Sequence, residues 1–342
     1  MAVAADLVRE AFRTEERGVD WRSGLAGALA TVVPLAIGLA IDEPAAGLTA
    51  GLGGLNTALP VPRAGLAARL WWGSLAVVGG ACAVAVAAAA SENDASLVLL
   101  SFAWVAAWAF FRAAGPTGAL LGFANSAMLV IFAGLPTTGP LGERLGWYLL
   151  GAVPALALMA LARRAERSVP VGLDALRMVG SAVQHDGTLR AHAVRLGVAV
   201  AAGSLLYRLV DLPHGYWVPL TILAILQPSV HGTLVRSIQR AAGTLVAAVL
   251  IVGIVWLTDH RWPLLVCATA TAFLLFALDE RGYFWLVVLL TPTALLMIST
   301  LDFQGDAVAV DRIANSTLGI VIGLAIGELA TAHARIRDPR GP

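Results

Sequence analysis

Residues 216–233 read YWVPLTILAILQPSVHGT, an apolar run that two prolines interrupt. The segment that follows the first proline and ends with the second, Leu220 to Pro228, is only nine residues long. A helix needs about 20 apolar residues to cross the ~30 Å hydrocarbon core of a bilayer, so this run is too short to cross alone. Gln227, His231 and Arg240 place polar groups beside the broken run.

The whole chain is as apolar as this stretch. Of its 342 residues, 58% are hydrophobic and 13% are charged, and the mean hydropathy is +0.80. These values lie outside the range of soluble globular domains. Because backbone groups inside hydrocarbon must satisfy one another, the composition predicts an all-α polytopic membrane protein.

Residue usage narrows the class further. All 23 basic residues are arginine, and the absence of lysine together with abundant alanine is typical of a GC-rich bacterial genome. Cys82 and Cys267 both lie within apolar runs, so neither a disulfide framework nor a paired-cysteine metal site is expected. The sequence contains no HExxH, GxSxG, Walker A or dinucleotide-binding motif, so no motif predicts an enzyme.

Apolar runs between charged clusters predict about twelve transmembrane or re-entrant helices. They cover residues 23–40, 46–59, 66–90, 95–111, 115–134, 145–162, 192–210, 215–229, 237–258, 262–278, 283–300 and 312–331. Whether 46–59 and 215–229 span or re-enter is left open. With both termini inside, 19 of the 23 arginines fall on the cytoplasmic side, as the positive-inside rule requires. A bacterial inner membrane with cytoplasmic termini is therefore the predicted location.

The two halves resemble each other at an offset of about 170 residues. Gly73-Ser74-Leu75 matches Gly243-Thr244-Leu245, and Gly151 matches Gly319. These matches predict two parallel six-helix repeats, related by an axis along the membrane normal, with the solute path where the repeats meet. The predicted organisation is an amphipathic N-terminus (1–22), a first repeat (23–162), a cytoplasmic linker (163–191), a second repeat (192–332) and a tail (333–342).

The residues of the second repeat also carry a resemblance to a known family. Tyr216-Trp217, Leu220-Thr221, Gln227-Pro228, Gly232-Thr233, Gln239-Arg240 and Gly243-Thr244 form a pattern that resembles the fusaric acid resistance or aromatic acid exporter family. The pattern is also similar to the membrane domain of plant aluminium-activated malate channels. The resemblance implies movement of organic anions, often aromatic carboxylates, across the inner membrane.

The candidate solute-binding residues are Arg240, Gln227, Thr221 and Trp217, joined by Asn56 and Arg69 of the first repeat. An arginine fork suits a carboxylate, Gln227 and Thr221 would hydrogen-bond it, and Trp217 would stack on a ring. For Arg240 and Arg69 the alternative is a positive-inside anchor, and for Trp217 it is an interfacial aromatic belt. Gln227 could instead join helices.

Glu328 and His231 are the candidates for proton coupling, because an intramembrane acid and a histidine can exchange protons near neutral pH. The predicted function is a proton-driven inner-membrane exporter of small organic anions, with aromatic carboxylates as the expected solutes. The alternatives are a passive anion channel and a non-transporting scaffold. No cofactor, metal or nucleic-acid partner is expected. The expected partners are a small organic anion and the lipid bilayer, and a homo-oligomer is left open.

Overall fold

The computed structural model describes residues 18–135, 139–257, 261–301 and 305–337, together with residues 7, 9–12 and 14 of the N-terminal segment. Helices dominate it, and the described residues contain no strand, so the all-α prediction is confirmed. The helices of the first half are α2 (Trp21–Ala40), α3 (Pro44–Ala58), α4 (Leu66–Ala90), α5 (Asp94–Ala109), the 3-10 helix η1 (Phe110–Ala114), α6 (Pro116–Gly134) and α7 (Leu141–Ala162).

A short amphipathic helix, α8 (Gly172–His185), connects the halves. The second half contains α9 (Gly187–Leu209), α10 (Trp217–Ile225), α11 (Val230–Leu257), α12 (Arg261–Ala277), the 3-10 helix η2 (Asp279–Arg281), α13 (Tyr283–Ser299) and α14 (Gly305–Arg337). Each of the twelve predicted segments coincides with one of these helices, apart from shifted ends. The largest shifts are at the starts of α11, at Val230 instead of residue 237, and of α14, at Gly305 instead of residue 312.

Within the part of the chain that the structure describes, seven helices are long and apolar enough to cross a membrane: α2, α4, α5 with η1, α6, α7, α9 and α11. The short helices differ from these. α10 has 9 residues and α3 has 15, which correspond to lengths of about 14 and 22 Å and leave each shorter than the ~30 Å hydrocarbon core. Pro219 lies in the first turn of α10, where a proline is tolerated, whereas Pro228 lies in the non-helical break that follows it.

The helix starts follow from local sequence. Asp20, Asn93 and Asp186 cap α2, α5 and α9, and each side chain accepts a hydrogen bond from a backbone N–H three residues ahead. α3 and α6 instead begin with a proline, whose missing N–H leaves no donor unsatisfied at that position.

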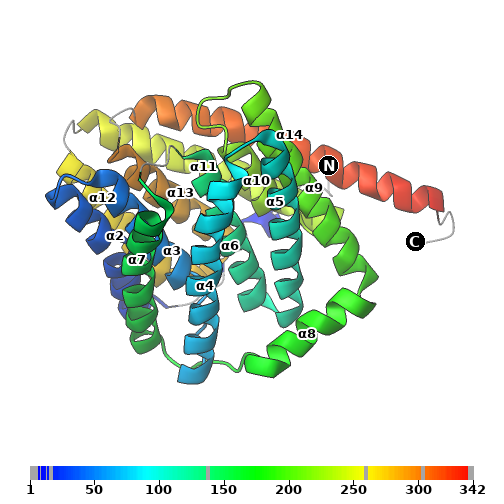
Figure 1. Cartoon of the computed structure of the whole chain (residues 1–342), viewed down its shortest axis with the longest axis horizontal. Coiled ribbons are helices and arrows are strands. Elements are labelled where there is room, and N and C mark those ends of the chain that lie inside the picture. The colour runs from blue at the N-terminus through cyan, green and yellow to red at the C-terminus, as the bar shows by residue number, and fades with distance from the viewer. Residues whose placement is uncertain are drawn as a thin grey trace.

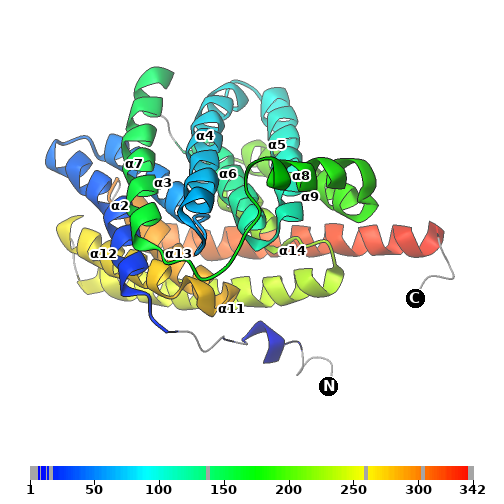
Figure 2. The ribbon, with the colours of Figure 1, turned by 90° about the horizontal axis from the view of Figure 1, so that it is seen from below.

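The helix pairs of the two halves correspond. α3 packs against α2 and α7, and α10 packs against α9 and α14; α4 packs against α6 and α7, and α11 packs against α13 and α14. Between the halves, α5 packs on α9 while α2 packs on α12. In Figures 1 and 2, α4, α5 and α7 stand upright whereas α11 and α14 run lengthwise across the molecule, so the two halves meet at a steep angle.

Glycines allow the short helices to lie close to their neighbours. A Cβ added at Gly151 of α7 would lie 1.8 Å from the carbonyl oxygen of Ala50, and one at Gly54 of α3 would lie 2.0 Å from that of Ala30. In the second half, a Cβ at Gly319 of α14 would lie 2.8 Å from the carbonyl oxygen of Val218 in α10. The glycine-rich run of α3 is therefore a close-packing surface.

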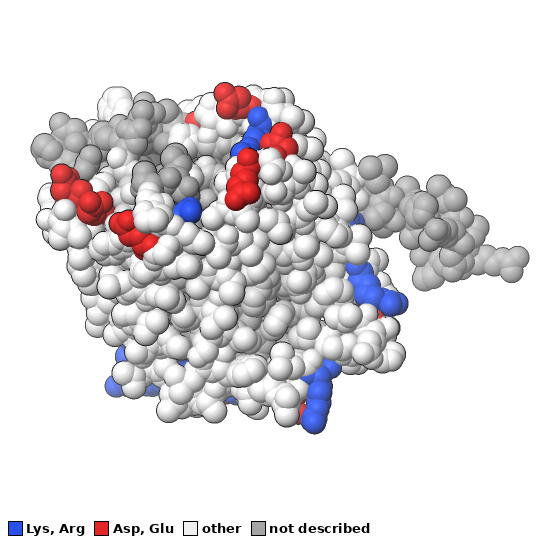
Figure 3. Space-filling view, in the orientation of Figure 1, with Lys and Arg blue, Asp and Glu red and all other residues white. Residues whose placement is uncertain are grey.

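Charge separates along the molecule. Figure 3 shows acidic side chains gathered along the upper edge and arginines mainly along the lower and right edges of the visible face. Here the acidic end is the end that carries Asp42, Glu43, Glu92, Asp94 and Glu143, and the basic end is the one that carries Arg63, Arg112, Arg163, Arg167 and Arg236.

Candidate functional site: a central cavity with a buried arginine

A cavity of about 70 Å³ lies where the halves meet. Its walls come from α3 and α6 of the first half and from α10, α11 and α13 of the second. Most of the lining is apolar, and the polar exceptions are Asn56, Trp217, Arg240 and Thr291. The cavity therefore brings together three of the six residues that the sequence predicts for solute binding.

Arg240 is the unusual member of this lining. It lies ten residues beyond the start of α11, which places it about 15 Å along the helix. The residue is 5% exposed, and its Nε is buried without a hydrogen-bond partner among the residues that the structure describes. No carboxylate among the described residues forms an ion pair with it. This depth argues against the interfacial-anchor alternative.

An unpaired guanidinium in an apolar environment is strongly unfavourable, because burial removes its hydration without supplying a counter-charge. An anion in the cavity would supply that charge. Arg240 could then hold a carboxylate with two parallel hydrogen bonds. The arrangement is chemically suited to binding an anionic group with an apolar body.

Asn56 of α3 lines the same central cavity as Arg240 and belongs to a buried polar network. Its Nδ2 lies 2.8 Å from the hydroxyl of Tyr148, 3.2 Å from Oδ1 of Asn125 and 3.1 Å from the carbonyl oxygen of Ala76. Gly80 makes room for the network, since a Cβ there would lie 1.7 Å from the Tyr148 hydroxyl. The network holds the Asn56 amide at the cavity wall.

Asn125 and Tyr148 were not among the site residues predicted from the sequence. Asn125 carried the same signal as Gln227, an amide inside an apolar segment, and that criterion could have found it. Tyr148 had no such signal, because a tyrosine near a helix start in a membrane protein reads as an interfacial residue. It is completely buried.

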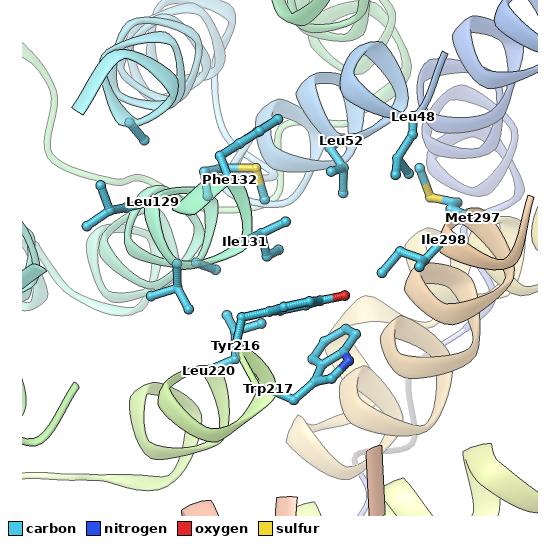
Figure 4. Close-up of a cluster of buried hydrophobic side chains, with 14 of the residues drawn as sticks. Leu48, Leu52, Leu129, Ile131, Phe132, Tyr216, Trp217, Leu220, Met297 and Ile298 are labelled. Atoms are coloured by element: carbon cyan, nitrogen blue, oxygen red, sulfur yellow. The ribbon is translucent and has the colours of Figure 1, made fainter. Parts of the chain in front are cut away.

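The aromatic pair at the start of α10 is also buried. Tyr216 and Trp217 are 2% and 4% exposed, and their ring centroids are 5.0 Å apart. Figure 4 shows both rings among apolar side chains of α3, α6 and α13. Their burial contradicts the aromatic-belt alternative, and Trp217 lines the cavity beside Leu220.

The same apolar cluster separates the cavity from the acidic end. Leu48, Leu52, Ile131, Phe132 and Ile298 converge between the short helix α3 and its neighbours in Figure 4. Leu48 and Phe132 also line a second pocket, of about 210 Å³, that carries Glu43, Glu143 and Arg144. On this side a layer of hydrophobic side chains therefore lies between the cavity and the pocket.

Toward the basic end the molecule is open. A vestibule of about 790 Å³ is lined by Arg112 of η1, by Arg236 and Gln239 of α11, by Tyr283 of α13 and by the loop after α10. Gln227 lines this vestibule, not the central cavity. Its backbone is held from both sides, because its N–H donates to Thr233 Oγ1 at 3.0 Å and its carbonyl accepts from Arg195 Nη2 at 2.7 Å.

Two predicted residues lie away from both spaces. Thr221 is buried against α14, where its Oγ1 lies 3.4 Å from Ser316 Oγ. Arg69 donates to the carbonyl oxygens of Ala160 and Arg163 and so caps the end of α7. The contacts of both residues join helices.

The proton-coupling candidates are not brought together with the cavity. The His231 side chain is 61% exposed, and its Nε2 lies 2.9 Å from Glu10 Oε2. The side chain of Glu328 lies outside the described residues. Proton coupling through either residue stays a prediction.

A second group of arginines is paired: Arg63 lies in the loop after α3, and Arg163 lies at the end of α7. Arg63 bridges to Asp279 at 3.1 Å, to Asp20 at 3.4 Å and to Glu166 at 3.4 Å, while Arg163 lies 2.6 Å from Asp279. These five residues are called the ion-pair cluster below. It joins the loop after α3 and the end of α7 to η2 of the second half.

Comparison with known proteins confirms the predicted resemblance over part of the chain. Residues 182–326 match the family model described as fusaric acid resistance protein-like. The chain is 29% identical over 140 residues to inner membrane protein YccS of Escherichia coli, covering 41% of this chain and 19% of that protein. It is 31% identical over 137 residues to the uncharacterized membrane protein YvaC of Bacillus subtilis, covering 39% and 21%.

A plant protein is similar as well. Over 82 residues the chain is 34% identical to aluminum-activated malate transporter 1 of Triticum aestivum, covering 22% of this chain and 18% of the transporter. The matched region spans about a fifth of the length of these curated relatives. No solved structure matches the chain. Together with the seven candidate spans, the matches identify an integral membrane protein.

Proposed function

We propose that this relative of fusaric acid resistance-like membrane proteins is a secondary transporter that exports small organic anions through a path between its two halves. Aromatic carboxylates are the favoured solutes. The observation that carries the proposal is Arg240, a buried cation without a carboxylate partner in the described structure, at the wall of a cavity between the halves. The name of the wheat relative, a malate transporter, supports an organic anion as the solute.

The shape of the cavity supports the aromatic preference. Trp217 and Phe123 line it together with leucine and isoleucine side chains, so an apolar or aromatic body has complementary walls. Its volume of about 70 Å³ suits a few water molecules. An aromatic acid would therefore require the neighbouring helices to move apart, which is the behaviour of a transporter with more than one state.

Two observations support two parallel repeats. The helix pairs of the two halves correspond, and Gly151 and Gly319 lie close to the short helices α3 and α10, respectively. In transporters built this way, binding lies at the repeat interface. The open vestibule at the basic end and the apolar layer toward the acidic end correspond to a state open to the cytoplasm, given the positive-inside orientation. A bacterial inner membrane with both termini in the cytoplasm completes the proposal.

A passive anion channel is the second candidate. It is favoured by the central cavity itself, whose lining contains no carboxylate or histidine that could couple a proton to the solute. The two candidates share the anion site and differ in whether a proton gradient drives net accumulation.

The test is uptake of radiolabelled benzoate and malate by proteoliposomes, with and without an imposed pH gradient. Arg240→Gln removes the charge but keeps hydrogen-bond donors, and we expect it to lower the flux by roughly 10- to 100-fold, because hydrogen bonds to charged groups contribute about 1.5–3 kcal/mol. Arg177→Gln is the matched control, since Arg177 is 76% exposed on α8. Accumulation against a concentration gradient only when the pH gradient is present supports the exporter.

Equal flux without a pH gradient supports the channel. Unchanged flux in folded Arg240→Gln protein would overturn both candidates, because each depends on the same buried cation.

A further inference from the structure

The vestibule at the basic end carries two arginines that have no acidic partner among the described residues. Arg112 and Arg236 come from different halves of the chain, and they lie near enough for their charges to repel each other. Among the described residues the guanidinium of Arg112 forms no hydrogen bond or ion pair, and Arg236 Nη1 is buried without a hydrogen-bond partner there. One carboxylate, Glu10, also lines the vestibule, but it pairs with His231 at 2.9 Å.

Arg236 is held in a fixed orientation. Its Cζ lies 3.8 Å from the centroid of the Tyr283 ring, and the Tyr283 hydroxyl donates to the carbonyl oxygen of Ala224 at 3.2 Å. Stacking on an aromatic face holds the guanidinium plane and leaves the N–H groups at its edge free to contact oxygen atoms. An anion that arrives would meet an arginine that has already lost much of its rotational freedom.

The charge of the vestibule specifies its ligand. Two guanidinium groups that repel each other are neutralised by an anion with two negative charges, whereas a monovalent anion leaves one positive charge. A phospholipid headgroup diester carries one charge and is the weaker match. The volume of about 790 Å³ leaves ample room for a small divalent anion.

We infer that Arg112 and Arg236 form a second anion site, in the vestibule, that binds small divalent oxyanions such as dicarboxylates, sulfate or phosphate. Arg236 and Arg240 are one helical turn apart on α11, a rise of about 6 Å, so the second site lies next to the central cavity. A solute can pass from one arginine to the next without losing its counter-charge. The existence of this second site is independent of the proposed function. Its role on the solute path rests on the proposed function.

The experiment is calorimetric titration of the full-length, detergent-purified chain with sodium sulfate, and in parallel with benzoate, at constant ionic strength. We expect Arg112→Gln and Arg236→Gln each to weaken sulfate binding about tenfold or more. Tyr283→Leu should weaken it several-fold, whereas Tyr283→Phe, which keeps the ring but loses the hydrogen bond to Ala224, should weaken it less. The matched control is Arg177→Gln on the exposed face of α8.

The outcomes separate this site from the central one. Sulfate binding that survives Arg240→Gln but not Arg236→Gln supports two sites. Sulfate affinity that none of the vestibule variants changes, or benzoate affinity equal to that of sulfate, overturns the vestibule site. In that event a loss of flux in Arg240→Gln would still support the central site, so the two proposals fail separately. Gel filtration and melting temperature establish that each variant is folded.

Discussion

Arginine has opposite roles at two corresponding places of the basic end. The loop after α3 faces η2, and the loop after α10 faces η1. In the first place Arg63 and Arg163 are buried in the ion-pair cluster and join the halves. In the second, Arg112 and Arg236 line an open vestibule without acidic partners in the described structure. Paired arginines close one side of the molecule, and unpaired arginines leave the other side able to bind an anion.

The difference arises from a few positions. Asp279 at the start of η2 supplies a carboxylate to both Arg63 and Arg163, whereas the corresponding 3-10 helix η1 carries Arg112. Since buried charge requires compensation, the closed side obtains it from the protein. The open side would obtain it from a ligand.

The largest expected effect comes from removing the shared carboxylate. Asp279→Asn leaves Arg63 and Arg163 buried with fewer counter-charges, and breaking a buried pair in this way costs about 3 kcal/mol or more. We expect a clear drop in the melting temperature of the detergent-purified protein. Asp174→Asn, which breaks the exposed Asp174–Arg177 pair on α8, should change it little, because exposed pairs contribute about 0–1 kcal/mol. Equal melting temperatures for the two variants would contradict the structural role of the cluster.

The next prediction concerns the unpaired arginine. Arg240→Met removes an uncompensated buried charge and replaces it with an apolar side chain, so stability should be unchanged or higher by about 1 kcal/mol. Adding benzoate should raise the melting temperature of the wild type, because a ligand that binds only the folded state stabilises it, and should leave Arg240→Met unaffected. A large destabilisation of ligand-free Arg240→Met would mean that Arg240 is held by the protein and not available to a solute.

A smaller effect is expected from the network beside the cavity. Tyr148→Phe removes the hydroxyl that lies 2.8 Å from Asn56 Nδ2 and should lower stability by about 1 kcal/mol. Because the network positions the Asn56 amide, solute affinity should fall with it, by a few-fold. Thr317→Val is a suitable control, since Thr317 is exposed on α14 and its hydroxyl bonds only its own helix. Flux and melting temperature that both stay at wild-type values would exclude a role for the network.

The smallest effect is a pH dependence at the ion-pair cluster. Burial by itself raises the pKa of Asp20, but the hydrogen bonds from Ser23 and the charges of Arg63 and Arg163 outweigh it and hold that pKa below its usual 3.8. A depressed carboxyl pKa contributes stability that is complete above pH 3.8 and is lost as the pH falls through the folded-state value. The melting temperatures of wild type and Asp20→Asn should therefore differ at pH 6 and converge as the pH drops below 3.8. A difference that is constant across this range would exclude titration of Asp20 as its cause.

Sequence alone determined the helical class, the twelve helical segments and the separation of acidic and basic ends. These features depend on local composition, because any backbone in hydrocarbon must form helices and charged groups must lie outside it. The break after α10 was equally local, since Pro228 cannot continue a helix. The family resemblance rested on residues within one such stretch.

Only the tertiary structure decided which polar residues face one another. Arg240 and Arg69 both looked like anchors or anion ligands in the sequence, yet one lines the central cavity and the other caps α7. Asn125 and Tyr148 are 69 and 92 residues from Asn56 and meet it only because α3, α6 and α7 pack together. Arg63 is paired with Asp279, a residue far away along the chain. Such pairing cannot be read from the sequence, because the attraction between charges depends on their distance in space.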